Sequence, residues 1–532
     1  MITKIKIQGY RIYDDFTLRP NKDLNILVGG NDAGKSTLME AIGLALNGRI
    51  GGRSAQEELN PYWFNKELVN QFLEDCAWDE NPALPEILIE LFLENRPELQ
   101  FLCGAINSDR KTNACPGISF KVIPNPEYDE ELTQWRINPS ALIPVEYYKI
   151  EWRTFGDEVL TRRPRQLAVA TIDSRTVRST SGIDYHLRQI LSDHLEPGEK
   201  AKISQHYREI KESMTSNSLG DVNKRLKNIR APLDNQVMAL AMDQSAQSSW
   251  EGSVTPHVNH VPFALAGQGQ QASIKISLAM QRLSEHTSIV MIEEPENHLS
   301  HTSLTTLLSR IEEAAGERQL FISTHSAYVL NRLGLSSLLL LHRGKASHIE
   351  TLDPDTVGYF QKLPGFDTLR MVLAHKLVLV EGPSDEILFE RFFRDLYGKH
   401  PMELGIDVMS MHGLTLKRCL ELCTAIDRPV AVLRDNDGED PDTLKETVNE
   451  LLKTGKRELF IGAKEAGRTL EPQLRACNSE ESLRKILGAT DRASLEKWMS
   501  REKTEAALLI AKSEETVTPP PYMAAAAAFI HG

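Results

Sequence analysis

The sequence has few cysteines, and their spacing shows no sign of a zinc ribbon or a disulfide framework. Six cysteines occur in 532 residues, at positions 76, 103, 115, 419, 423 and 477, and no two of them form a Cys-x-x-Cys pair. A zinc ribbon needs such pairs, and a disulfide-rich secreted domain needs a denser set. Cys419 and Cys423 are spaced to share one helix face, where we expect two thiols of a hydrophobic core.

A long apolar run is also missing. A membrane-spanning helix needs about 20 consecutive apolar residues, and the chain contains no run near that length. The N-terminus lacks the apolar segment of a signal peptide. We therefore expect a cytoplasmic protein with no membrane partner. The prolines at 519–521 and the alanine run that ends at Ala528 predict a short C-terminal helix after a stiff break, and we assign it no function.

Positive charge is in deficit. The chain has 61 Lys and Arg against 74 Asp and Glu, which gives a net charge of -13. This balance excludes a surface coated with basic residues for nucleic acid, although it leaves room for a local basic groove. The hydrophobic share of 41% and the charged share of 25% are ordinary for a globular protein. A chain of this length predicts roughly two to four domains.

A glycine-rich, phosphate-binding pattern follows the first buried-strand run. Residues 24–28 are typical of a buried strand, residues 29–37 fit G-x-x-x-x-G-K-[ST], and residues 38–46 predict a helix. The glycines let backbone N–H groups wrap phosphates, the lysine supplies charge for the outer phosphates, and the serine hydroxyl can bind Mg²⁺. The alternative is a simple glycine-rich turn. We predict an ATP and Mg²⁺ site with these contacts: Gly29, Asn31, Asp32, Gly34, Lys35, Ser36 and Thr37.

Three further segments follow the glycine-rich loop in an order that supports an ATPase. A turn at 265–271 precedes a helix-like stretch, a strand at 288–292 ends in Glu293 and Glu294, and a strand at 320–323 leads to His325. Each acid or histidine stands at the carboxyl end of a strand, where open α/β sheets bind their ligands. Read alone, each is a solvated edge or a turn, but their order favours the functional interpretation.

These motifs resemble those of ABC-type ATPases, in particular the branch that includes SMC proteins. The resemblance implies that Glu293 holds Mg²⁺ through water, that Glu294 polarises the attacking water, and that His325 lies near the terminal phosphate. It also implies a signature that reaches the ATP of a second subunit, formed by Gly267, Gln268 and Gly269. Two residues depart from the family pattern: Glu293 replaces an aspartate, and Ala266 replaces a serine whose hydroxyl can contact the phosphate. Slow hydrolysis is therefore expected.

The segment between the glycine-rich loop and the signature predicts an insertion over about 50–255. It begins with short strand-like pieces and asparagine- and proline-rich turns, and it looks largely helical over 186–245. The resemblance implies an arm or dimerisation element here. Residues 152–188 hold seven arginines against four acids. This strip is either a phosphate-contacting surface or a solvated face.

Acidic residues follow two more strands near the C-terminus. A strand over 377–380 ends at Glu381, and a strand over 429–433 leads to Asp435 and Asp437. Residues two apart on an extended chain point to one face, so both aspartates can meet Glu381 across neighbouring strands. Hard oxygen ligands select Mg²⁺ or Mn²⁺ over zinc. The glycine at the fourth position of the 435–440 loop excludes a calcium loop, and an acid-rich turn is the remaining alternative.

The pattern strand-Glu-Gly-x-x-Asp-helix, followed by strand-x-Asp-x-Asp, resembles the Toprim domain of topoisomerases, primases and certain nucleases. An ABC-type ATPase joined to a C-terminal Toprim domain resembles the OLD (overcoming lysogenization defect) family of bacterial nucleases. The fold class expected is α/β, with an ATPase domain over 1–368, its partly helical insertion, and a Toprim domain with a parallel sheet over 369–532. The resemblance implies two metal ions held by acidic residues, with a lysine that stabilises the transition state: Glu381, Asp385, Asp435, Asp437, Glu471 and Lys503.

We accordingly expect an ATP-regulated, metal-dependent DNA endonuclease in which dimerised ATPase heads control access of DNA to the Toprim site. The resemblance implies a homodimer or higher homo-oligomer, a role in defence against bacteriophage, and a separately encoded helicase-like protein or retron reverse transcriptase and its DNA as possible partners. The main alternative is an SMC-like DNA clamp with a non-cleaving or regulatory Toprim domain. A topoisomerase or primase-like enzyme is a second alternative, although no segment reads as a tyrosine-nucleophile or nucleotide-polymerising domain. Activation and inhibition of cleavage by ATP are both compatible with the sequence.

Overall fold

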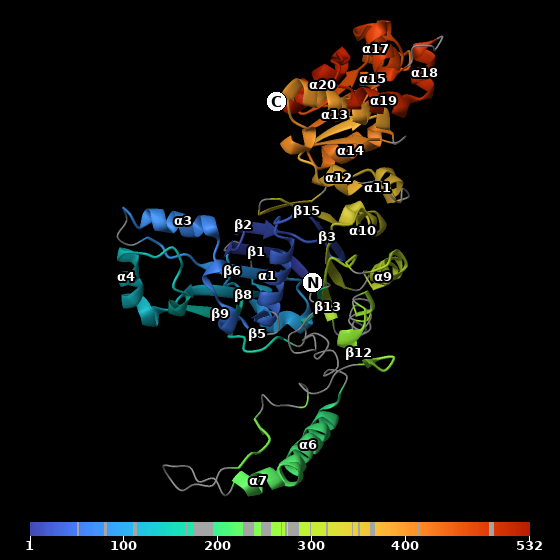
Figure 1. Cartoon of the computed structure of the whole chain (residues 1–532). Coiled ribbons are helices and arrows are strands. Elements are labelled where there is room, and N and C mark those ends of the chain that lie inside the picture. The colour runs from blue at the N-terminus through green and yellow to red at the C-terminus, as the bar shows by residue number, and fades with distance from the viewer. Residues whose placement is uncertain are drawn as a thin grey trace. The chain divides into compact units, whose positions relative to one another are not determined.

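The computed structural model divides into two compact units (Figure 1). The N-terminal unit comprises residues 1–27, 31–324 and 341–346, and the C-terminal unit comprises residues 28–30, 325–340 and 347–532. The structure describes the chain except for residues 51–52, 79–81, 110–113, 165–166, 174–194, 227–238, 246–249, 251–256, 268, 272–273, 275–286, 298, 315–317, 343, 349–351, 362–367, 412–414 and 489–493.

An antiparallel sheet forms one part of the N-terminal unit. Its strand order is β2-β1-β6-β8-β7, and β9 pairs with β8. The strands are β1 (Ile2–Tyr10), β2 (Tyr13–Leu18), β6 (Ile87–Leu93), β7 (Cys103–Gly104), β8 (Cys115–Pro124) and β9 (Tyr148–Thr154). Buried and less buried side chains alternate in the middle of β1, where Ile5 and Ile7 are fully buried and Lys6 between them is not.

Strands β6, β8 and β9 thus pair in the same sheet as β1, although they lie within the insertion that the sequence predicts over about 50–255. Their pairing partner lies some 80 residues earlier in the chain, so the local pattern did not reveal it. The later part of the same segment contains the helices α6 (Pro197–Ser213) and α7 (Gly220–Leu226), joined by a π-helical turn over Met214–Ser218. In the arginine-rich strip of 152–188, residues 165–166 and 174–188 lie outside the described residues, and with them four of the seven arginines, Arg165, Arg175, Arg178 and Arg188.

A parallel sheet forms the second part of the N-terminal unit. Four of its strands lie side by side in the order β10-β13-β14-β3, and all three pairings are parallel. They are β10 (Ala168–Asp173), β13 (Thr287–Glu293), β14 (Gln319–Ser323) and β3 (Leu24–Val28). Every residue of β3 and β14 is buried, as expected for parallel strands covered on both faces.

Helix α1 (Lys35–Asn47) contacts both sheets of the N-terminal unit. It touches β6 and β8 of the antiparallel sheet and β10 and β14 of the parallel sheet. The side-chain amide of Gln319 also joins the two sheets, because it accepts from the Ile2 N–H at 2.7 Å and donates to the Ile2 carbonyl at 2.9 Å. The helix that follows the glycine-rich loop is therefore packed against both sheets.

The C-terminal unit is built on a four-stranded parallel sheet in the order β18-β17-β19-β20. The strands are β17 (Lys376–Val380), β18 (Ile406–Ser410), β19 (Val430–Arg434) and β20 (Arg457–Ile461). Helices α13 (Pro383–Tyr397) and α20 (Pro521–His531) contact each other and this sheet. The predicted fold class, a P-loop ATPase domain followed by a Toprim-type parallel-sheet domain, is confirmed.

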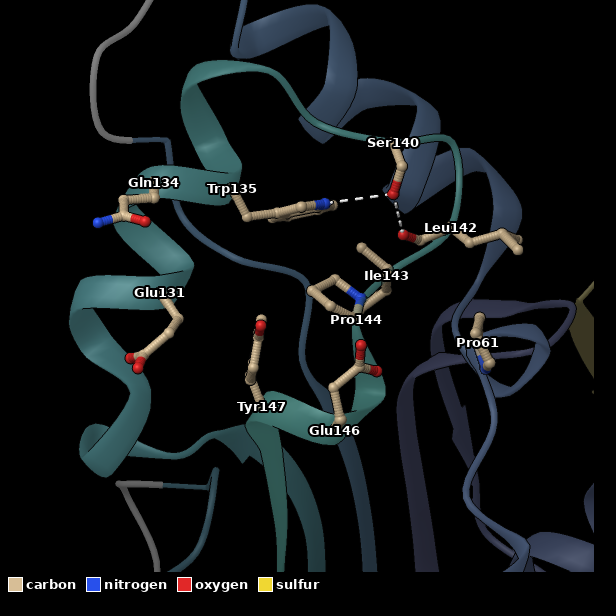
Figure 2. Close-up of a pocket in the computed structure, with 10 residues that line it drawn as sticks. All are labelled: Pro61, Glu131, Gln134, Trp135, Ser140, Leu142, Ile143, Pro144, Glu146 and Tyr147. Atoms are coloured by element: carbon tan, nitrogen blue, oxygen red, sulfur yellow. Dashed lines mark hydrogen bonds between the residues drawn. The ribbon is translucent and has the colours of Figure 1, made fainter.

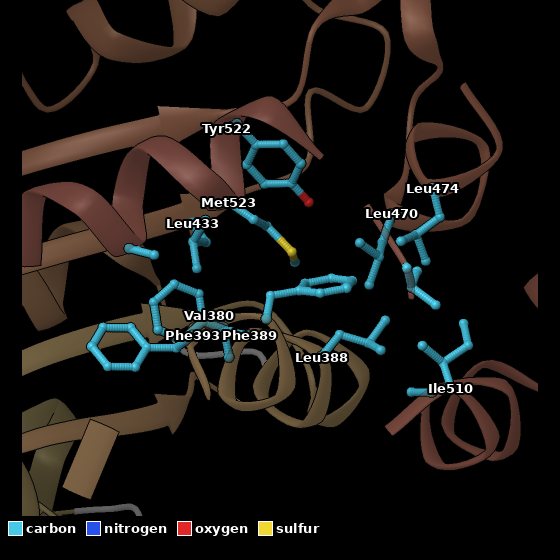
Figure 3. Close-up of a cluster of buried hydrophobic side chains, with 14 of the residues drawn as sticks. Val380, Leu388, Phe389, Phe393, Leu433, Leu470, Leu474, Ile510, Tyr522 and Met523 are labelled. Atoms are coloured by element: carbon cyan, nitrogen blue, oxygen red, sulfur yellow. The ribbon is translucent and has the colours of Figure 1, made fainter. Parts of the chain in front are cut away.

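The hydrophobic core of the C-terminal unit includes its last helix (Figure 3). The alanine-rich tail forms α20, as predicted, and its Met523 and Ala526 are buried with Val380 and Phe389 of the sheet and of α13. Cys419 and Cys423 are fully buried on α14 (Leu416–Ala425), so they are core thiols as expected. The tail is thus an integral part of the folded unit.

The remaining helices and short strands connect these layers. In the described residues, no helix is long and apolar enough to cross a membrane. The larger of these elements are α3 (Lys66–Asp75), α4 (Asp129–Ile137), α9 (His301–Ala314), α10 (Ala327–Leu333), β15 (Leu338–His342), β16 (Lys345–His348), α11 (Pro354–Gln361), α12 (Thr368–Leu373), α15 (Pro441–Glu446), α16 (Leu470–Cys477), α17 (Glu480–Leu487), α18 (Leu495–Arg501) and α19 (Lys503–Lys512).

Candidate nucleotide and metal sites

The glycine-rich loop leads from β3 into α1 through a left-handed residue. Gly34 has φ +99°, and a Cβ placed there would lie 2.5 Å from Ile12 Cδ1 and 2.6 Å from Tyr13 Oη. The Tyr13 hydroxyl donates to the Gly34 carbonyl at 3.0 Å. Glycine is therefore required here by both backbone conformation and space. Lys35 follows as the first residue of α1, and only 6% of it is exposed.

Two predicted magnesium ligands meet although 257 residues separate them. Ser36 Oγ donates to Glu293 Oε2 at 2.9 Å, which brings the start of α1 to the carboxyl end of β13. Glu293 is 8% exposed, so the carboxylate lies in a largely desolvated position. A hydroxyl and a carboxylate in this arrangement can share one cation.

The neighbouring acid, Glu294, sits in a special backbone conformation. Its φ is +46°, and its N–H donates to the Ser323 carbonyl at 2.9 Å. The side chain accepts a hydrogen bond from Asn297 Nδ2 at 2.6 Å, an orienting contact that the sequence motif did not identify. Thr324 Oγ1 donates to Glu296 Oε1 at 2.9 Å, and His325 follows directly at the end of β14.

The structure describes two of the three residues of the predicted signature, Gly267 and Gly269. Gly267 is exposed, and a Cβ there would meet no atom within 4 Å. Gly269 lies in a helical turn, and Gln271 Nε2 donates to the Ala266 carbonyl at 2.7 Å. Gln268 lies outside the described residues.

The acids of the C-terminal unit gather at the carboxyl edge of its sheet. Glu381 directly follows β17 and Asp435 directly follows β19, which are neighbouring parallel strands. Asp385 lies in the first turn of α13, where its carboxylate accepts from the Gly382 N–H at 3.1 Å. At the end of β18, Ser410 Oγ donates to the Glu381 carbonyl at 3.3 Å. This edge is where parallel α/β sheets bind their ligands.

The carboxyl groups at this edge raise one another's pKa. Burial and then repulsion by Asp437 and Asp385 raise the pKa of Glu381 to about 7. Burial and repulsion by Glu471 raise the pKa of Asp385 to about 6, against the opposing Gly382 N–H. Burial, followed by Asp385, Glu381 and Glu471, raises the pKa of Asp435 to about 8. These groups therefore share one electrostatic environment, in which bound positive charge is favoured.

Glu471 and Lys503 join this environment from two later helices. Glu471 lies at the start of α16, is 3% exposed, and accepts from Thr469 Oγ1 at 2.7 Å. Lys503 begins α19, and its Nζ lies 3.5 Å from Glu471 Oε1. The Lys503 charge also lowers the pKa of Asp385 and Asp435, in opposition to burial. The structure thus places both residues beside the acids at the strand ends.

Two residues that the sequence motifs did not identify, Arg434 and Asn436, support the acids at this edge of the sheet. Arg434 Nε lies 3.6 Å from Glu381 Oε1. Asn436 is fully buried, and its Nδ2 donates to the carbonyls of Gly462 at 2.9 Å and Gly467 at 2.7 Å. It therefore anchors the turn between Asp435 and the exposed Asp437, which has φ +50°. Both partners of Asn436 lie on a distant loop, so local sequence carried no signal for this role.

The donor set fits a hard divalent cation by its chemistry. The groups that face this edge are carboxylates, which Mg²⁺ and Mn²⁺ prefer. Within the described ranges, no three histidine, cysteine, aspartate or glutamate side chains stand in a ready coordination geometry. A bound divalent cation would relieve the mutual repulsion of these carboxylates.

A separate pocket of about 590 Å³ lies beside α4 in the N-terminal unit (Figure 2). Trp135 forms one wall, stacks on Phe72 with ring centroids 5.7 Å apart, and donates from Nε1 to Ser140 Oγ at 3.2 Å. No residue of the predicted nucleotide or metal site lines this pocket, so we assign it to neither. Its lining consists of Pro61, Glu131, Gln134, Trp135, Ser140, Leu142, Ile143, Pro144, Glu146 and Tyr147.

Three regions of the chain match known protein families. Residues 372–437 match the family described as "Overcoming lysogenization defect protein-like, TOPRIM domain". Residues 4–96 match an "AAA domain" family, and residues 173–331 match "AAA domain, putative AbiEii toxin, Type IV TA system". The matched regions contain the glycine-rich loop, the strand-end acids of the ATPase, and the first Toprim acids.

Two curated proteins are similar over part of their length. Endonuclease GajA of Bacillus cereus (strain VD045) is 26% identical over 153 residues, which are 28% of this chain and 26% of that protein. OLD nuclease of Thermus scotoductus (strain ATCC 700910 / SA-01) is 28% identical over 188 residues, which are 32% of this chain and 35% of that protein. The chain thus spans about a quarter to a third of these relatives.

Among solved structures, the C-terminal region of the Burkholderia pseudomallei OLD protein is 20% identical and matches 30% of this chain and 98% of its own, with a TM-score of 0.24. An SMC head bound to the C-winged helix domain of ScpA is 12% identical and matches 66% of this chain and 98% of its own, with a TM-score of 0.34. Along one sequence, AAA-family matches are followed by a match to an OLD-like Toprim domain, so in these regions the chain is similar to proteins of the overcoming lysogenization defect (OLD) family.

Proposed function

We propose that the chain is an ATP-binding and ATP-hydrolysing, metal-dependent DNA endonuclease. The observation that carries this proposal is the gathering of carboxylates from β17, α13, β19 and α16 at one sheet edge, with Lys503 beside them. The names of the two curated relatives, an endonuclease and a nuclease, support the same reaction class. We place the Toprim domain at 369–532 and the ATPase domain at 1–368.

The proposed cleavage site uses each acidic group as an oxygen ligand or a base. Two Mg²⁺ or Mn²⁺ ions would be held here. Their ligands would be Glu381, Asp385, Asp435, Asp437 and Glu471. When bound, such ions hold the scissile phosphate, lower the pKa of an attacking water and stabilise the departing 3′-oxygen.

Lys503 and Glu381 have further roles in this proposal. The Lys503 ammonium, half-exposed beside buried Glu471, is positioned to offset the negative charge that develops on the phosphate during cleavage. Glu381 accepts the proton of the attacking water when it is not engaged as a ligand. Arg434 lies against Glu381 and keeps that carboxylate oriented toward the site.

The ATPase site would control this cleavage. Lys35 binds the outer phosphates, and Ser36 with Glu293 holds Mg²⁺, in keeping with their 2.9 Å contact. Glu294 polarises the attacking water, and its hydrogen bond from Asn297 fixes its orientation. His325 would contact the terminal phosphate.

A second copy of the chain would complete each ATPase site. The exposed Gly267, together with Gln268 and Gly269, would reach the ATP of a partner copy, and the missing hydroxyl at Ala266 would slow hydrolysis. We therefore propose a homodimer or higher homo-oligomer that acts on DNA in the cytoplasm, where ATP and phage DNA occur together. Defence against bacteriophage, with a separately encoded helicase-like protein or retron reverse transcriptase and its DNA as partner, is the proposed setting.

The testing experiment is incubation of the purified full-length chain with supercoiled plasmid and Mg²⁺ or Mn²⁺, with and without ATP. Metal-dependent conversion to open-circle or linear DNA supports the nuclease, and the ATP arms show whether the nucleotide activates or inhibits cleavage. DNA binding with intact plasmid under every condition favours the SMC-like clamp. Relaxation without nicked product favours a topoisomerase.

A further inference from the structure

Tyr522 is a buried tyrosine whose hydroxyl has no hydrogen-bond partner. It lies in the first turn of α20, is 7% exposed, and its Oη makes no hydrogen bond with the described residues. Figure 3 shows its ring above Met523, with the hydroxyl pointing toward the side on which Leu470 lies. A buried polar group without a partner is unfavourable, so such a group in a native core indicates an acceptor supplied from elsewhere.

The packing places Tyr522 among the neighbours of the Toprim acids. Its hydrophobic cluster contains Val380, which precedes Glu381, together with Leu433 and Leu470. Leu470 precedes Glu471, and Leu433 stands two residues before Asp435. Helix α20 itself contacts β17, β19 and α13, the three elements from which Glu381, Asp435 and Asp385 project.

The electrostatic environment of Tyr522 leads to the same edge of the sheet. Burial raises the pKa of the Tyr522 hydroxyl well above its usual value, and the carboxyl groups of Asp385, Asp435, Glu381 and Glu471 raise it further. The phenol is therefore neutral at physiological pH. It can donate a hydrogen bond toward the acids, but it is a poor nucleophile.

We propose that Tyr522 is a positioning residue of the Toprim site, whose hydroxyl donates a hydrogen bond to a water molecule held by the acid cluster. The inference rests on the proposed nuclease function and adds to it a residue from the C-terminal helix, outside the acidic motifs. The hydroxyl orients the water, and the acids with their cations carry out the reaction. Packing of the ring alone does not require the oxygen, because phenylalanine has the same apolar ring.

The test compares Tyr522→Phe with Tyr148→Phe in the full-length chain. Tyr148 is a matched control, because it is 3% exposed and its hydroxyl also lacks a partner among the described residues, but it lies on β9 of the N-terminal unit. The measurements are plasmid nicking over a Mn²⁺ titration and the rise of the unfolding temperature with Mn²⁺. We expect Tyr522→Phe to slow nicking about tenfold or more and to shift the Mn²⁺ midpoint. Tyr148→Phe should match the parent.

Equal behaviour of Tyr522→Phe and the parent in both measurements would overturn the inference, and so would equal losses in the two variants. If the parent cuts no plasmid, the proposed nuclease function fails, and the Mn²⁺ midpoint from thermal unfolding then decides the role of Tyr522. A covalent protein–DNA adduct, trapped by detergent from the parent and absent from Tyr522→Phe, would also overturn it. That outcome would make the tyrosine a nucleophile.

Discussion

Lys503 Nζ lies 3.5 Å from Glu471 Oε1, so a half-exposed cation at the start of α19 is paired with an almost fully buried carboxylate on α16. A buried carboxylate is costly unless it is paired, and Thr469 supplies its other close contact. The pair therefore stabilises a buried carboxylate at this edge of the unit, and in the proposed nuclease the same lysine would supply the charge used in cleavage.

Replacement of Lys503 should reveal both effects. Lys503→Gln leaves Glu471 without its cation, so we expect a lower unfolding temperature for the metal-free protein. We also expect nicking to fall by about 10²-fold, because positive charge beside the reacting phosphate is lost. Lys512→Gln, at the exposed other end of α19, is the control and should match the parent. Unchanged nicking in Lys503→Gln would exclude the proposed role.

Replacement of Asp435 should have opposite effects on stability and activity. Asp435→Asn removes a carboxyl that burial and three neighbouring acids make unfavourable when ionised. We therefore expect the metal-free variant to unfold a few degrees higher than the parent, since about 1 kcal/mol shifts the midpoint of a unit this size by about 2–4 °C. Nicking and the stabilisation by Mn²⁺ should both be lost. The exposed Asp442→Asn on α15 should change neither.

The pH dependence of that gain has a definite sign. The folded-state pKa of Asp435 is raised to about 8, whereas an unfolded aspartate titrates near about 3.9. The folded state therefore retains a proton that the unfolded state releases, and the metal-free parent loses stability as pH rises from about 4 to about 8. Asp435→Asn should lose less over this window in thermal unfolding. An identical pH profile for the two proteins would contradict this electrostatic account.

The glycine-rich loop predicts a loss of nucleotide binding in Lys35→Ala. Lys35 is buried at the start of α1, where the outer phosphates are expected. Equilibrium titration with a fluorescent ATP analogue should show no saturable binding by this variant. Glu294→Gln is the matched comparison, because it should bind ATP like the parent and lose hydrolysis. Parental affinity in Lys35→Ala would overturn the phosphate-binding interpretation.

Asn436 predicts a structural effect on the metal site. Its side chain is fully buried and donates to the carbonyls of Gly462 and Gly467, so Asn436→Ala removes this donor from the buried Gly462 carbonyl, whereas the Gly467 carbonyl keeps its hydrogen bond from Gln473 Nε2. We expect a loss of about 1–3 kcal/mol of unfolding free energy and weaker Mn²⁺ binding, because the turn that carries Asp435 and Asp437 loses its anchor. Denaturant unfolding measures the first and thermal titration the second. Asn449→Ala, at an exposed site, provides the reference.

The local chemistry of both proposed sites was readable from sequence, because each depends on short patterns that follow a buried strand. The loop at 29–37, the acids at 293–294 and the acids at 381 and 435 all stand at strand ends, as expected. The C-terminal helix and the buried thiols on α14 were likewise predictable from residue type and spacing.

The tertiary structure decided which residues that lie far apart in the chain contact one another. Strands β6, β8 and β9 extend the sheet that contains β1, the Asn436 amide bonds a loop about 30 residues away, and α20 brings Tyr522 into the core with Val380, Leu433 and Leu470. Spacing along a helix or strand constrains only near neighbours. Hydrogen-bond partners and the mutual repulsion of buried carboxyls depend on which distant segments the fold brings together. Only the folded structure specifies these long-range contacts.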